Sequence, residues 1–365
     1  MKIAVTGTRG IYNIQGGVET HCEELYTRMA SKREDVTVFR RKNFVSPSNA
    51  ATEYRGVKLI DTYAPRSKFF EAFYHTFTSV FRAKRLHPDI LHIHNIGPAL
   101  LAPVARLLGM KVVVTVHSFN YDHAKWNKLA KAVLRLGERM TMHFANAVIT
   151  ISDVNQRTLE ARYKKKVHLI YNGVNKPQIT TARDYIDTLG LNRRPYMVAL
   201  GRFTPEKGFH DLIAAYRQSG LSEKCALVIA GDADHKTDYT IELKRDAADA
   251  GVILTGFIKG ERLAQVMSNA SLFVMPSYNE GLPIALLEAM SYGLDVAVSD
   301  IEPNRLPMLD ANDYFPVGNR KAIADKLREK VTGTSNEKRH YDLSAYNWDT
   351  ITEQTLDVYR SVINA

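Results

Sequence analysis

A regular alternation of short apolar runs with longer amphipathic segments is the feature that most constrains this fold. The apolar runs, among them KIAVTGT, DVTVFRR and KVVVTVH, are typical of buried strands, and the segments between them place apolar residues at helical spacing. The alternation stops in a polar stretch around residue 178 and starts again near residue 195. Strands that alternate with helices predict a parallel, doubly wound sheet. The sequence therefore predicts two Rossmann-like α/β domains.

The expected division of the chain follows from this break. We expect one domain over residues 1–178, a second over residues 179–345, and a terminal amphipathic helix over residues 346–365 that returns to the first domain. A chain of 365 residues, 45% of them hydrophobic, is long enough for two such cores. Because ligands of open α/β sheets bind beyond the carboxyl ends of the strands, we expect the site in a cleft between the two domains.

The charge balance indicates an anionic partner. The net charge of +10 suits a nucleic acid, an anionic membrane or a phosphorylated substrate. The sequence contains no nucleic-acid-binding motif that we recognise, so no nucleic-acid partner is expected. The N-terminal MKIAVTGTRG lacks the apolar core of a signal peptide, and no run reaches the ~18 apolar residues that span a bilayer. The expected location is the cytoplasm, and the charge also permits peripheral attachment to the inner face of the cytoplasmic membrane.

Three motifs of the first domain lie at expected strand ends. Gly16 and Gly17 lie in TRGIYNIQGGVET, where glycines before a helix favour a ligand, although their spacing differs from a dinucleotide fingerprint. A plain connecting loop is the alternative. His117 ends VVVTVH and is expected to face the cleft. His92 and His94 end DILHIH, and we expect one of them in the core and the other in the cleft. No metal is expected there, since no carboxylate or cysteine accompanies them.

The second domain places cations and acids at its strand ends. Arg202 and Lys207 flank a tight turn before a helix in GRFTPEKGFHDLI, which favours binding of a diphosphate over a solvated basic turn. Asp232 and Asp234 form a literal DxD, the pattern that holds a divalent cation in some sugar transferases. An Asp-rich turn is the favoured interpretation, and no metal is expected.

The segment NEGLPIALLEAM joins two glutamates to a helix start. Pro283 suits the first helical turn because its missing N–H costs nothing there, and Gly281 and Leu282 expose backbone amides at the mouth of the helix. Glu280 precedes the helix and Glu288 lies inside it. A single glutamate near a helix N-terminus is explained by its favourable interaction with the helix dipole. Two glutamates around a Gly-Leu-Pro at a strand end favour a ligand site.

These segments resemble a known family. GRFTPEKGFHDLI, GFI and MPSYNEGLPIALLEAMSYGLDVAVSD are similar to the donor half of the retaining glycosyltransferases of family 4, which have the GT-B fold of two facing Rossmann-like domains. TRGIYNIQGGVET and HSFNYDHAKW resemble a bacterial branch that includes rhamnosyltransferases of surface polysaccharides. The resemblance implies that residues 1–178 bind the acceptor and residues 179–345 bind a nucleotide-sugar donor.

The resemblance also implies roles for individual residues. Arg202 and Lys207 would bind the donor diphosphate, and Glu288 would bind the ribose. Glu280 would bind a hydroxyl of the transferred sugar, with His117 near the sugar. The implied catalytic set is His117, Arg202, Lys207 and Glu280. The other implied donor-binding residues are Gly16, Gly17, Phe257, Ile258, Gly281 and Leu282. The nucleotide sugar, UDP- or dTDP-linked, is a substrate, and no cofactor is implied.

The implied activity is metal-independent hexosyl transfer with retention, from a nucleotide sugar to a lipid-linked saccharide in bacterial surface polysaccharide synthesis. Fixed cations and helix N–H groups suit this reaction because they stabilise the diphosphate as it leaves. A double displacement would need a carboxylate beside the anomeric carbon, and we identify none. Attack by the acceptor on the same face of the sugar from which the diphosphate leaves is therefore favoured. A nucleotide-sugar epimerase of the same fold and a non-catalytic nucleotide-sugar-binding module stay open as alternatives.

Residues 66–85 mix aromatic with basic side chains. Phe70, Phe73, Phe77 and Phe81 recur at helical spacing among the basic residues of this segment. One interpretation is a helix that lies in the interface of an anionic membrane. The other, which is the commoner arrangement, is a helix that packs its aromatic face on the sheet of its own domain.

Overall fold

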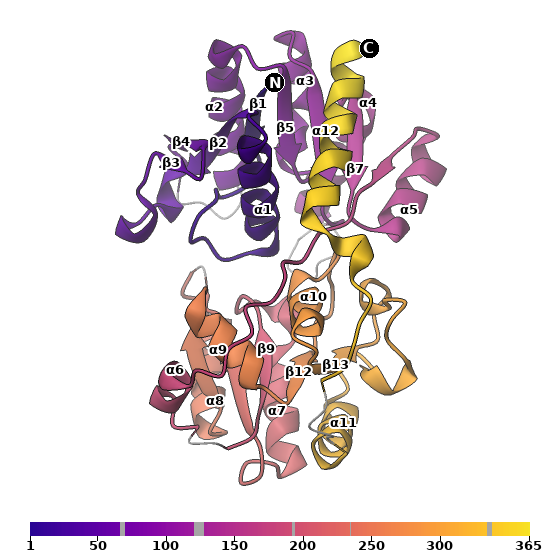
Figure 1. The fold of residues 1–365 in the computed structure, drawn as a ribbon. Coiled ribbons are helices and arrows are strands. Elements are labelled where there is room, and N and C mark those ends of the chain that lie inside the picture. Colours follow the sequence, from indigo (N-terminus) through magenta and orange to yellow (C-terminus); the bar gives the residue numbers. More distant parts are fainter. Residues whose placement is uncertain (66–69, 120–127, 192–193, 234, 334–337) are drawn as a thin grey trace. The chain divides into compact units, whose positions relative to one another are not determined.

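The computed structural model describes residues 1–65, 70–119, 128–191, 194–233, 235–333 and 338–365. The chain forms two compact units (Figure 1). Unit 1 comprises Met1–Gly173 and Tyr346–Ala365, and unit 2 comprises Val174–Ala345. The first division falls in the polar stretch between the two runs of strands, and the second places the terminal helix in unit 1.

Unit 1 is built on an eight-stranded sheet with the order β3-β4-β2-β1-β5-β6-β7-β8. Neighbouring strands run parallel, except for the antiparallel pair β3 and β4. Without its two short edge strands, the sheet has the doubly wound strand order. In this order the chain first adds strands on one side of β1 and then, from β5 on, on the other side. The strands are β1 (Lys2–Thr6), β2 (Asp35–Arg41), β3 (Glu53–Tyr54), β4 (Val57–Thr62), β5 (Ile90–His94), β6 (Val112–Val116), β7 (Ala147–Thr150) and β8 (His168–Leu169).

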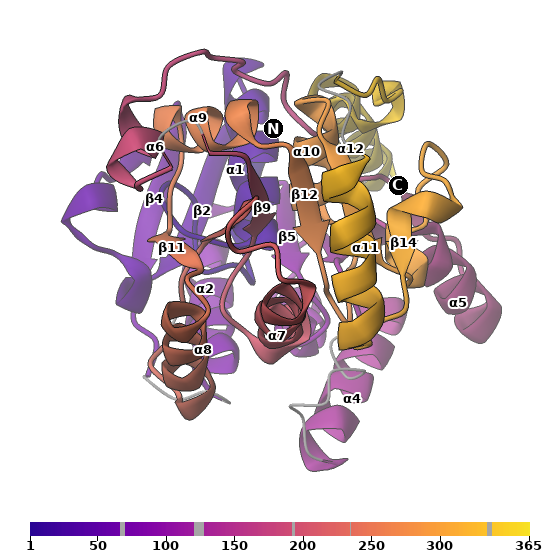
Figure 2. The same ribbon diagram turned by 90° about the horizontal axis from the view of Figure 1, so that it is seen from below.

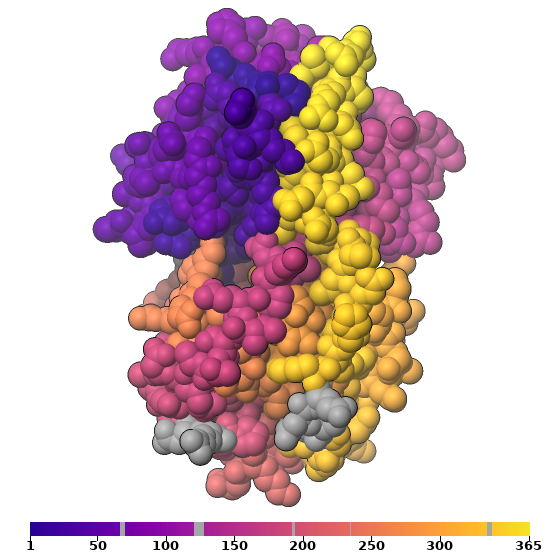
Figure 3. Space-filling view, viewed as in Figure 1, coloured from indigo at the N-terminus to yellow at the C-terminus, as the bar shows by residue number. Residues whose placement is uncertain are grey.

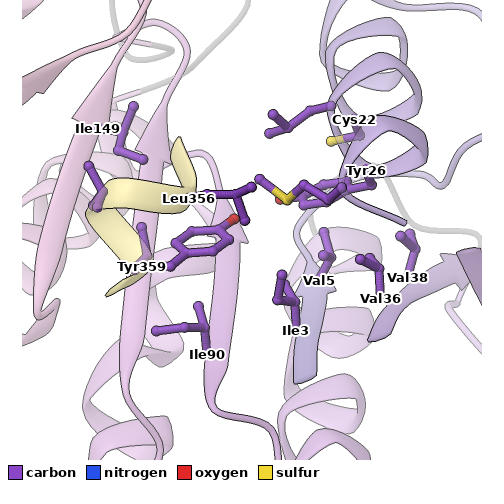
Figure 4. Close-up of a cluster of buried hydrophobic side chains, with 14 of the residues drawn as sticks. Ile3, Val5, Cys22, Tyr26, Val36, Val38, Ile90, Ile149, Leu356 and Tyr359 are labelled. Carbon is purple, nitrogen blue, oxygen red and sulfur yellow. The ribbon is translucent and has the colours of Figure 1, made fainter. Parts of the chain in front are cut away.

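Helices cover both faces of this sheet because successive side chains of a buried strand point to opposite faces. Ile3 and Val5 of β1 pack in one core with α1 and α12 (Figure 4), whereas Ala4 packs in the other with α2, α3 and α4. Figure 3 shows α12, in yellow, lying against the N-terminal part of unit 1, where it contacts α1. The helices of unit 1 are α1 (Gly17–Ser31), α2 (Glu71–Leu86), α3 (Ala102–Leu107), α4 (Lys128–Phe144), α5 (Asp153–Tyr163) and α12 (Trp348–Asn364).

Unit 2 has a fully parallel six-stranded sheet with the order β11-β10-β9-β12-β13-β14, which is the same doubly wound order with its switch point between β9 and β12. Figure 2 shows α7, α8 and α11 along one face of this sheet and α6, α9 and α10 along the other. The strands are β9 (Tyr196–Leu200), β10 (Ala226–Ala230), β11 (Ile253–Gly256), β12 (Leu272–Met275), β13 (Asp295–Ser299) and β14 (Tyr314–Phe315). The helices are α6 (Asp184–Thr188), α7 (Phe209–Ser219), α8 (Asp238–Asp249), α9 (Glu261–Asn269), α10 (Ile284–Ser291) and α11 (Arg320–Thr332). The prediction of two Rossmann-like α/β domains is confirmed.

Helix α2 presents its aromatic face to solvent. This is the opposite of the commoner arrangement, in which that face packs on the sheet. Its aromatic face is exposed: Phe70 keeps 66% of its surface accessible, and Phe73, Phe77 and Phe81 keep 41 to 42%. Its buried positions are mostly polar or small, and they are Glu71, His75, Thr76, Ser79, Val80 and Ala83. The interpretation that the phenylalanines pack on the sheet is therefore wrong, because polar groups of this helix already fill the inner face. In the described part of the chain, no helix is both long enough and apolar enough to cross a bilayer.

Candidate functional site

The switch point of unit 2 brings together two of the residues that the sequence singled out. Lys207 lies in the loop after β9 and Glu280 in the loop after β12. Lys207 Nζ lies 2.6 Å from Glu280 Oε1, and the two side chains keep 21% and 11% of their surface exposed. Arg202 is partly buried in the same loop as Lys207. A cation and a carboxylate therefore meet at neighbouring strand ends, where an α/β sheet binds its ligands.

Backbone contacts hold these two loops against each other. Tyr278 donates its backbone N–H to the carbonyl oxygen of Glu206 at 2.8 Å. Gly208 has a φ of +67°, and a Cβ there would lie 2.2 Å from the carbonyl oxygen of Pro276. Only glycine permits both the left-handed backbone and this close approach. The position of Lys207 beside Glu280 is thus set by main-chain packing and not by the ion pair alone.

A second charged cluster anchors the loop that carries Glu280. The Tyr278 hydroxyl donates to the carboxylate of Asp211 on α7, and Arg320 Nε donates to the same carboxylate at 2.6 Å. The hydrogen bond to Asp211 raises the pKa of Tyr278 to about 12. The ring of His210 stacks on Tyr278 with the planes 5° apart. Sequence reasoning did not identify this cluster, because its members come from α7, α11 and the loop after β12.

The helix after this loop begins one residue later than expected. α10 starts at Ile284, and Pro283 is its N-cap with φ −77° and ψ 100°, so the expectation that Pro283 lies in the first turn is wrong. The physical reason is that the ψ of Pro283 is extended and not helical, so the first helical residue is the one that follows it. Leu282 is 8% exposed, while Gly281 and Glu288 are partly buried. No acidic residue lies in the first turn of α10, so its N–H groups keep their partial positive charge.

Two buried hydroxyl groups of the same loops have no hydrogen-bond partner among the described residues. They are Thr204 Oγ1, in the loop after β9, and Ser277 Oγ, in the loop after β12. A buried polar atom of this kind is costly unless a ligand or water pairs with it. Sequence reasoning missed both, because a single Ser or Thr in a loop carries no pattern. A role for these two hydroxyl groups is indicated by the structure, which places them in the loops that carry Lys207 and Glu280.

Other predicted residues of unit 2 lie on neighbouring strand ends without a described contact to this pair. Phe257 and Ile258 follow β11; Phe257 is 44% exposed and Ile258 is 8% exposed. Asp232 follows β10, accepts the backbone N–H of Ala233 at 2.8 Å and pairs with Lys244 at 2.8 Å. Asp234, the other half of the DxD, lies outside the described residues.

In unit 1, the glycine loop carries its own carboxylate. Gly16 is the N-cap of α1 with φ +151°, and Gly17 is the first residue of the helix. Glu19 is 7% exposed, and its Oε1 accepts hydrogen bonds from Thr8 Oγ1 and from the backbone N–H of Arg9, both at 3.2 Å. A Cβ on Gly16 would lie 2.0 Å from Glu19 Oε2. Glu19, which sequence reasoning missed, therefore partly neutralises the N-terminus of α1.

Four histidines of unit 1 form one buried cluster. His92 and His94 are both fully buried, so the expectation that one of them lines a cleft is wrong: β5 is covered by helices on both faces. His117, which follows β6, is 5% exposed, and its Nε2 lies 2.9 Å from His94 Nδ1. His21 of α1 joins them, with its ring centroid 4.9 Å from that of His117. Burial lowers the pKa of His21 to about 4, although the hydrogen bond to Asn172 opposes this shift.

Three of these histidines have the spacing of a metal site. His21, His94 and His117 each offer one ring nitrogen, and the three nitrogens lie within 4.8 Å of one another. His21 is far from the HxH pair in sequence, so no motif could have indicated the group. The group contains no carboxylate or cysteine.

Two family models together match nearly the whole chain. Residues 15–176 match the model of Glycosyltransferase Family 4, and residues 183–347 match the model of Glycosyl transferases group 1. The boundary between the two matches falls close to the division between unit 1 and unit 2.

Individual relatives are similar along most of their length. The uncharacterized glycosyltransferase MJ1607 of Methanocaldococcus jannaschii is 24% identical, with 99% of this chain and 98% of that protein covered. The UDP-Gal:alpha-D-GlcNAc-diphosphoundecaprenol alpha-1,3-galactosyltransferase of Escherichia coli is 28% identical, with 62% of this chain and 62% of that protein covered. Among solved structures, Anabaena Alr3699/HepE in complex with UDP and glucose has a TM-score of 0.77 at 17% identity, covering 99% of this chain and 100% of that one. Sucrose-phosphate synthase of Thermosynechococcus elongatus has a TM-score of 0.75 at 20% identity and covers both chains fully, 100% each.

Proposed function

The chain is a glycosyltransferase of the GT-B type, built from a Glycosyltransferase Family 4 domain and a Glycosyl transferases group 1 domain, and we propose that it transfers a hexosyl group from a nucleoside-diphosphate sugar with retention. The single observation that carries this proposal is the pair of Lys207 and Glu280 at the switch point of unit 2. The pair supplies the two functions that such a donor needs at one place: a cation for the diphosphate and an acceptor for sugar hydroxyls.

The charges of the site support departure of a diphosphate. As the bond between the anomeric carbon and the phosphate oxygen breaks, negative charge grows on the leaving group. Lys207, Arg202 and the N–H groups at the start of α10 would stabilise that charge, and such prepositioned groups act on the transition state without reorganisation. We assign the diphosphate to these groups.

We assign Glu280 to a hydroxyl of the transferred sugar. Its carboxylate already pairs with Lys207, and the same two groups can hold the sugar and the adjoining phosphate of a donor. A covalent double displacement would require Glu280 to attack the anomeric carbon, which its pairing with Lys207 disfavours. In the proposed step, the acceptor oxygen bonds to the anomeric carbon on the face that the phosphate leaves, and the departing phosphate oxygen takes the acceptor proton.

The remaining assignments of the donor follow the strand ends of unit 2 and the resemblance to the family. Glu288 of α10 would bind the ribose hydroxyls, and Phe257 with Ile258 would border the base of a UDP- or dTDP-linked donor. From unit 1, we assign His117 to the side of the transferred sugar and Gly16 with Gly17 to the phosphate and acceptor. No metal enters this proposal, since lysine and arginine supply the positive charge.

We assign the acceptor to the class of lipid-linked saccharides, as intermediates of a bacterial surface polysaccharide. Two observations support this. The E. coli relative is named as acting on GlcNAc-diphosphoundecaprenol. The exposed aromatic face of α2, together with a net charge of +10, suits peripheral contact with an anionic membrane, here the inner face of the cytoplasmic membrane.

A transfer assay tests the proposal. The protein is first screened by thermal unfolding with UDP, dTDP and their sugars, because a ligand that binds the folded state raises its apparent stability. Stabilising donors are then incubated with a synthetic GlcNAc-diphospho-lipid, and release of the nucleotide and the linkage of the product are measured. We expect a product with the anomeric configuration of the donor.

Three outcomes would contradict parts of the proposal. Interconversion of the donor sugar without nucleotide release would favour the epimerase. Tight donor binding without turnover across an acceptor panel would favour a non-catalytic module. Loss of transfer in EDTA that is restored by Mg²⁺ or Mn²⁺ would contradict metal independence.

A further inference from the structure

A continuous chain of buried polar side chains lies behind His117. The Tyr26 hydroxyl, from α1, lies 2.8 Å from His92 Nδ1 and 2.6 Å from His94 Nε2. The other ring nitrogen of His94, Nδ1, lies 2.9 Å from His117 Nε2. Tyr26, His92 and His94 are fully buried, and His117 is 5% exposed. The proposed transfer reaction uses only the last member of this chain.

The far end of the chain belongs to the terminal helix. The Tyr359 hydroxyl, from α12, makes a short hydrogen bond with His92 Nδ1, and His92 Nε2 lies 2.7 Å from Thr115 Oγ1. Figure 4 shows the side chain of Tyr359 extending from α12 toward Tyr26. The last segment of the sequence therefore reaches the group behind His117 through polar contacts inside unit 1.

The histidines of this chain are neutral. Burial lowers the pKa of His92 to about 3, and burial together with the neighbouring histidines lowers the pKa of His94 and of His117 well below its usual value. A neutral imidazole has one N–H, so one ring nitrogen donates and the other accepts. Each hydrogen bond in the chain then fixes the direction of the next.

Two directions balance the protons, and the shorter contacts favour one of them. When His92 accepts on Nδ1, the shorter of its two contacts there, with Tyr359, takes its one lone pair and leaves the Tyr26 proton for His94. Tyr26 has one hydroxyl proton, and the shorter of its two histidine contacts is with His94 Nε2. When Tyr26 donates to His94 Nε2, the His94 proton lies on Nδ1 and is donated to His117 Nε2. The proton of His117 then lies on its Nδ1.

We propose that Tyr26 and His94 hold His117 in the tautomer that carries its proton on Nδ1, and so act as positioning residues for His117. The functional part of this inference rests on the proposed role of His117 beside the transferred sugar. In this tautomer, the nitrogen that does not face His94 is a hydrogen-bond donor, which suits a sugar oxygen. The opposite tautomer would present a bare lone pair there and would bind a different pattern of hydroxyl groups.

A metal is the rival explanation of the cluster, because His21, His94 and His117 have suitable spacing and His21 Nε2 is buried without a hydrogen-bond partner among the described residues. The distance of 2.9 Å between His94 Nδ1 and His117 Nε2 is that of a hydrogen bond. A divalent cation in this group would be held by neutral rings alone, and burying an uncompensated charge is costly. These facts favour the hydrogen-bonded chain.

Nuclear magnetic resonance of the full-length protein tests the proposal without an activity assay. Histidine is labelled with ¹⁵N, and long-range ¹H–¹⁵N spectra distinguish a protonated ring nitrogen from a bare one. The variant His117→Gln assigns the signal of His117. We expect one tautomer of His117 in the wild type, protonated on Nδ1, and no titration of this ring between pH 6 and pH 8.

Two variants then break the chain at different places. Tyr26→Phe removes the donor to His94, and we expect His117 to show both tautomers in comparable amounts. Tyr359→Phe frees His92 Nδ1 to accept the Tyr26 proton, and we expect the His117 proton to shift toward Nε2. Tyr346→Phe removes the hydroxyl of another buried tyrosine of unit 1, and we expect no change. An equal mixture of tautomers should lower kcat/KM about twofold, in proportion to the competent population.

The outcomes separate this inference from the proposed function. A wild-type His117 protonated on Nε2, a tautomer unchanged in both Tyr26→Phe and Tyr359→Phe, or stoichiometric Zn²⁺ binding that shifts the signals of His21, His94 and His117 would each overturn the inference. If Tyr26→Phe does not fold, Tyr359→Phe alone decides. The expected tautomers in a protein without transferase activity would overturn the proposed function and leave the positioning of His117 intact.

Discussion

The two units share one strand order but carry opposite chemistry at the carboxyl ends of their strands. In unit 2, Lys207 and Glu280 form an ion pair whose side chains are 21% and 11% exposed. In unit 1, His94 and His117 are joined by a hydrogen bond of 2.9 Å and are 0% and 5% exposed. The Rossmann topology therefore fixes where a site is formed, while the side chains at the strand ends decide whether it works by fixed charge or by neutral hydrogen bonds.

The difference has a physical cause. A charge at a strand end keeps its hydration or its counterion only if the loop stays partly open, as the loops after β9 and β12 do. Imidazoles beneath covering helices lose hydration and stay neutral, because burial disfavours the charged form. Perturbing charge should therefore act strongly in unit 2, and perturbing protonation should act strongly in unit 1.

The largest expected effect comes from removing the cation of unit 2. Lys207→Ala should lower kcat/KM for the donor by about 10²–10³-fold, the loss found when a prepositioned group for developing charge is removed. Steady-state kinetics measure the effect. Lys326→Ala, which removes a lysine that pairs with Glu329 at 2.8 Å on α11, is the matched control. Near-normal turnover in folded Lys207→Ala would contradict the assignment of Lys207 to the donor diphosphate.

A smaller effect is expected at the acidic partner. Glu280→Gln keeps the shape of the side chain but removes its charge, and we expect a loss of about 10–100-fold in kcat/KM, as for a charged hydrogen bond. Because Gln still accepts a hydrogen bond, transfer should remain measurable. If Glu280 were instead the nucleophile, Glu280→Gln would abolish transfer, and the same-face mechanism would have to be abandoned.

In unit 1, the comparison predicts a pH dependence of stability. The pKa of His21 is lowered to about 4 by burial, whereas an unfolded histidine has a pKa of about 6.5. The stability linked to neutral His21 is thus fully present above pH ~6.5 and is lost as the pH falls toward 4, by about 1.4 kcal/mol per pH unit. His21→Asn should reduce the slope by about this amount in urea unfolding at pH 7, 6 and 5, while the other buried histidines keep their share of the pH dependence.

The control for this prediction is His87→Asn. His87 is exposed and has a φ of +50°, a conformation that Asn tolerates. This variant should keep the slope of the wild type. Equal slopes for His21→Asn and the wild type would contradict a neutral, buried His21.

The smallest effect is expected on the exposed face of α2. Vesicles with phosphatidylglycerol should bind the protein at low salt and release it as salt rises. Phe73→Ser combined with Phe77→Ser should weaken binding about tenfold, because two aromatic side chains leave the interface. Leu107→Ser combined with Ile179→Ser, at exposed positions elsewhere, is the control. Equal sedimentation of both double variants would remove α2 from the proposed membrane contact.

The sequence predicted the fold because each strand and helix has a local pattern. KIAVTGT contains β1 and KVVVTVH contains β6, and both were recognised as apolar runs. Lys207 and Glu280 were each placed at a strand end from such patterns. Their contact could not be predicted, since they are 73 residues apart and meet only because β9 and β12 are neighbours.

The errors have the same origin. The pattern of α2 gave a helix with an aromatic face but not the direction of that face, which depends on Glu71, His75 and other polar groups packing inward. The HxH of β5 gave two histidines on a strand, but only the helices on both faces of the sheet made both of them buried. Thr204 and Ser277 carried no signal at all.

By itself, the sequence determined two Rossmann-like domains and the loops at which a ligand site could form, because strands, helices and turns depend on residues that are near in the chain. Only the tertiary structure decided that Lys207 meets Glu280, that His21 and Tyr359 join the histidines behind His117, and that the phenylalanines of α2 face outward. These contacts depend on strand order and on which helix covers which face, and both are settled by burial over the whole unit.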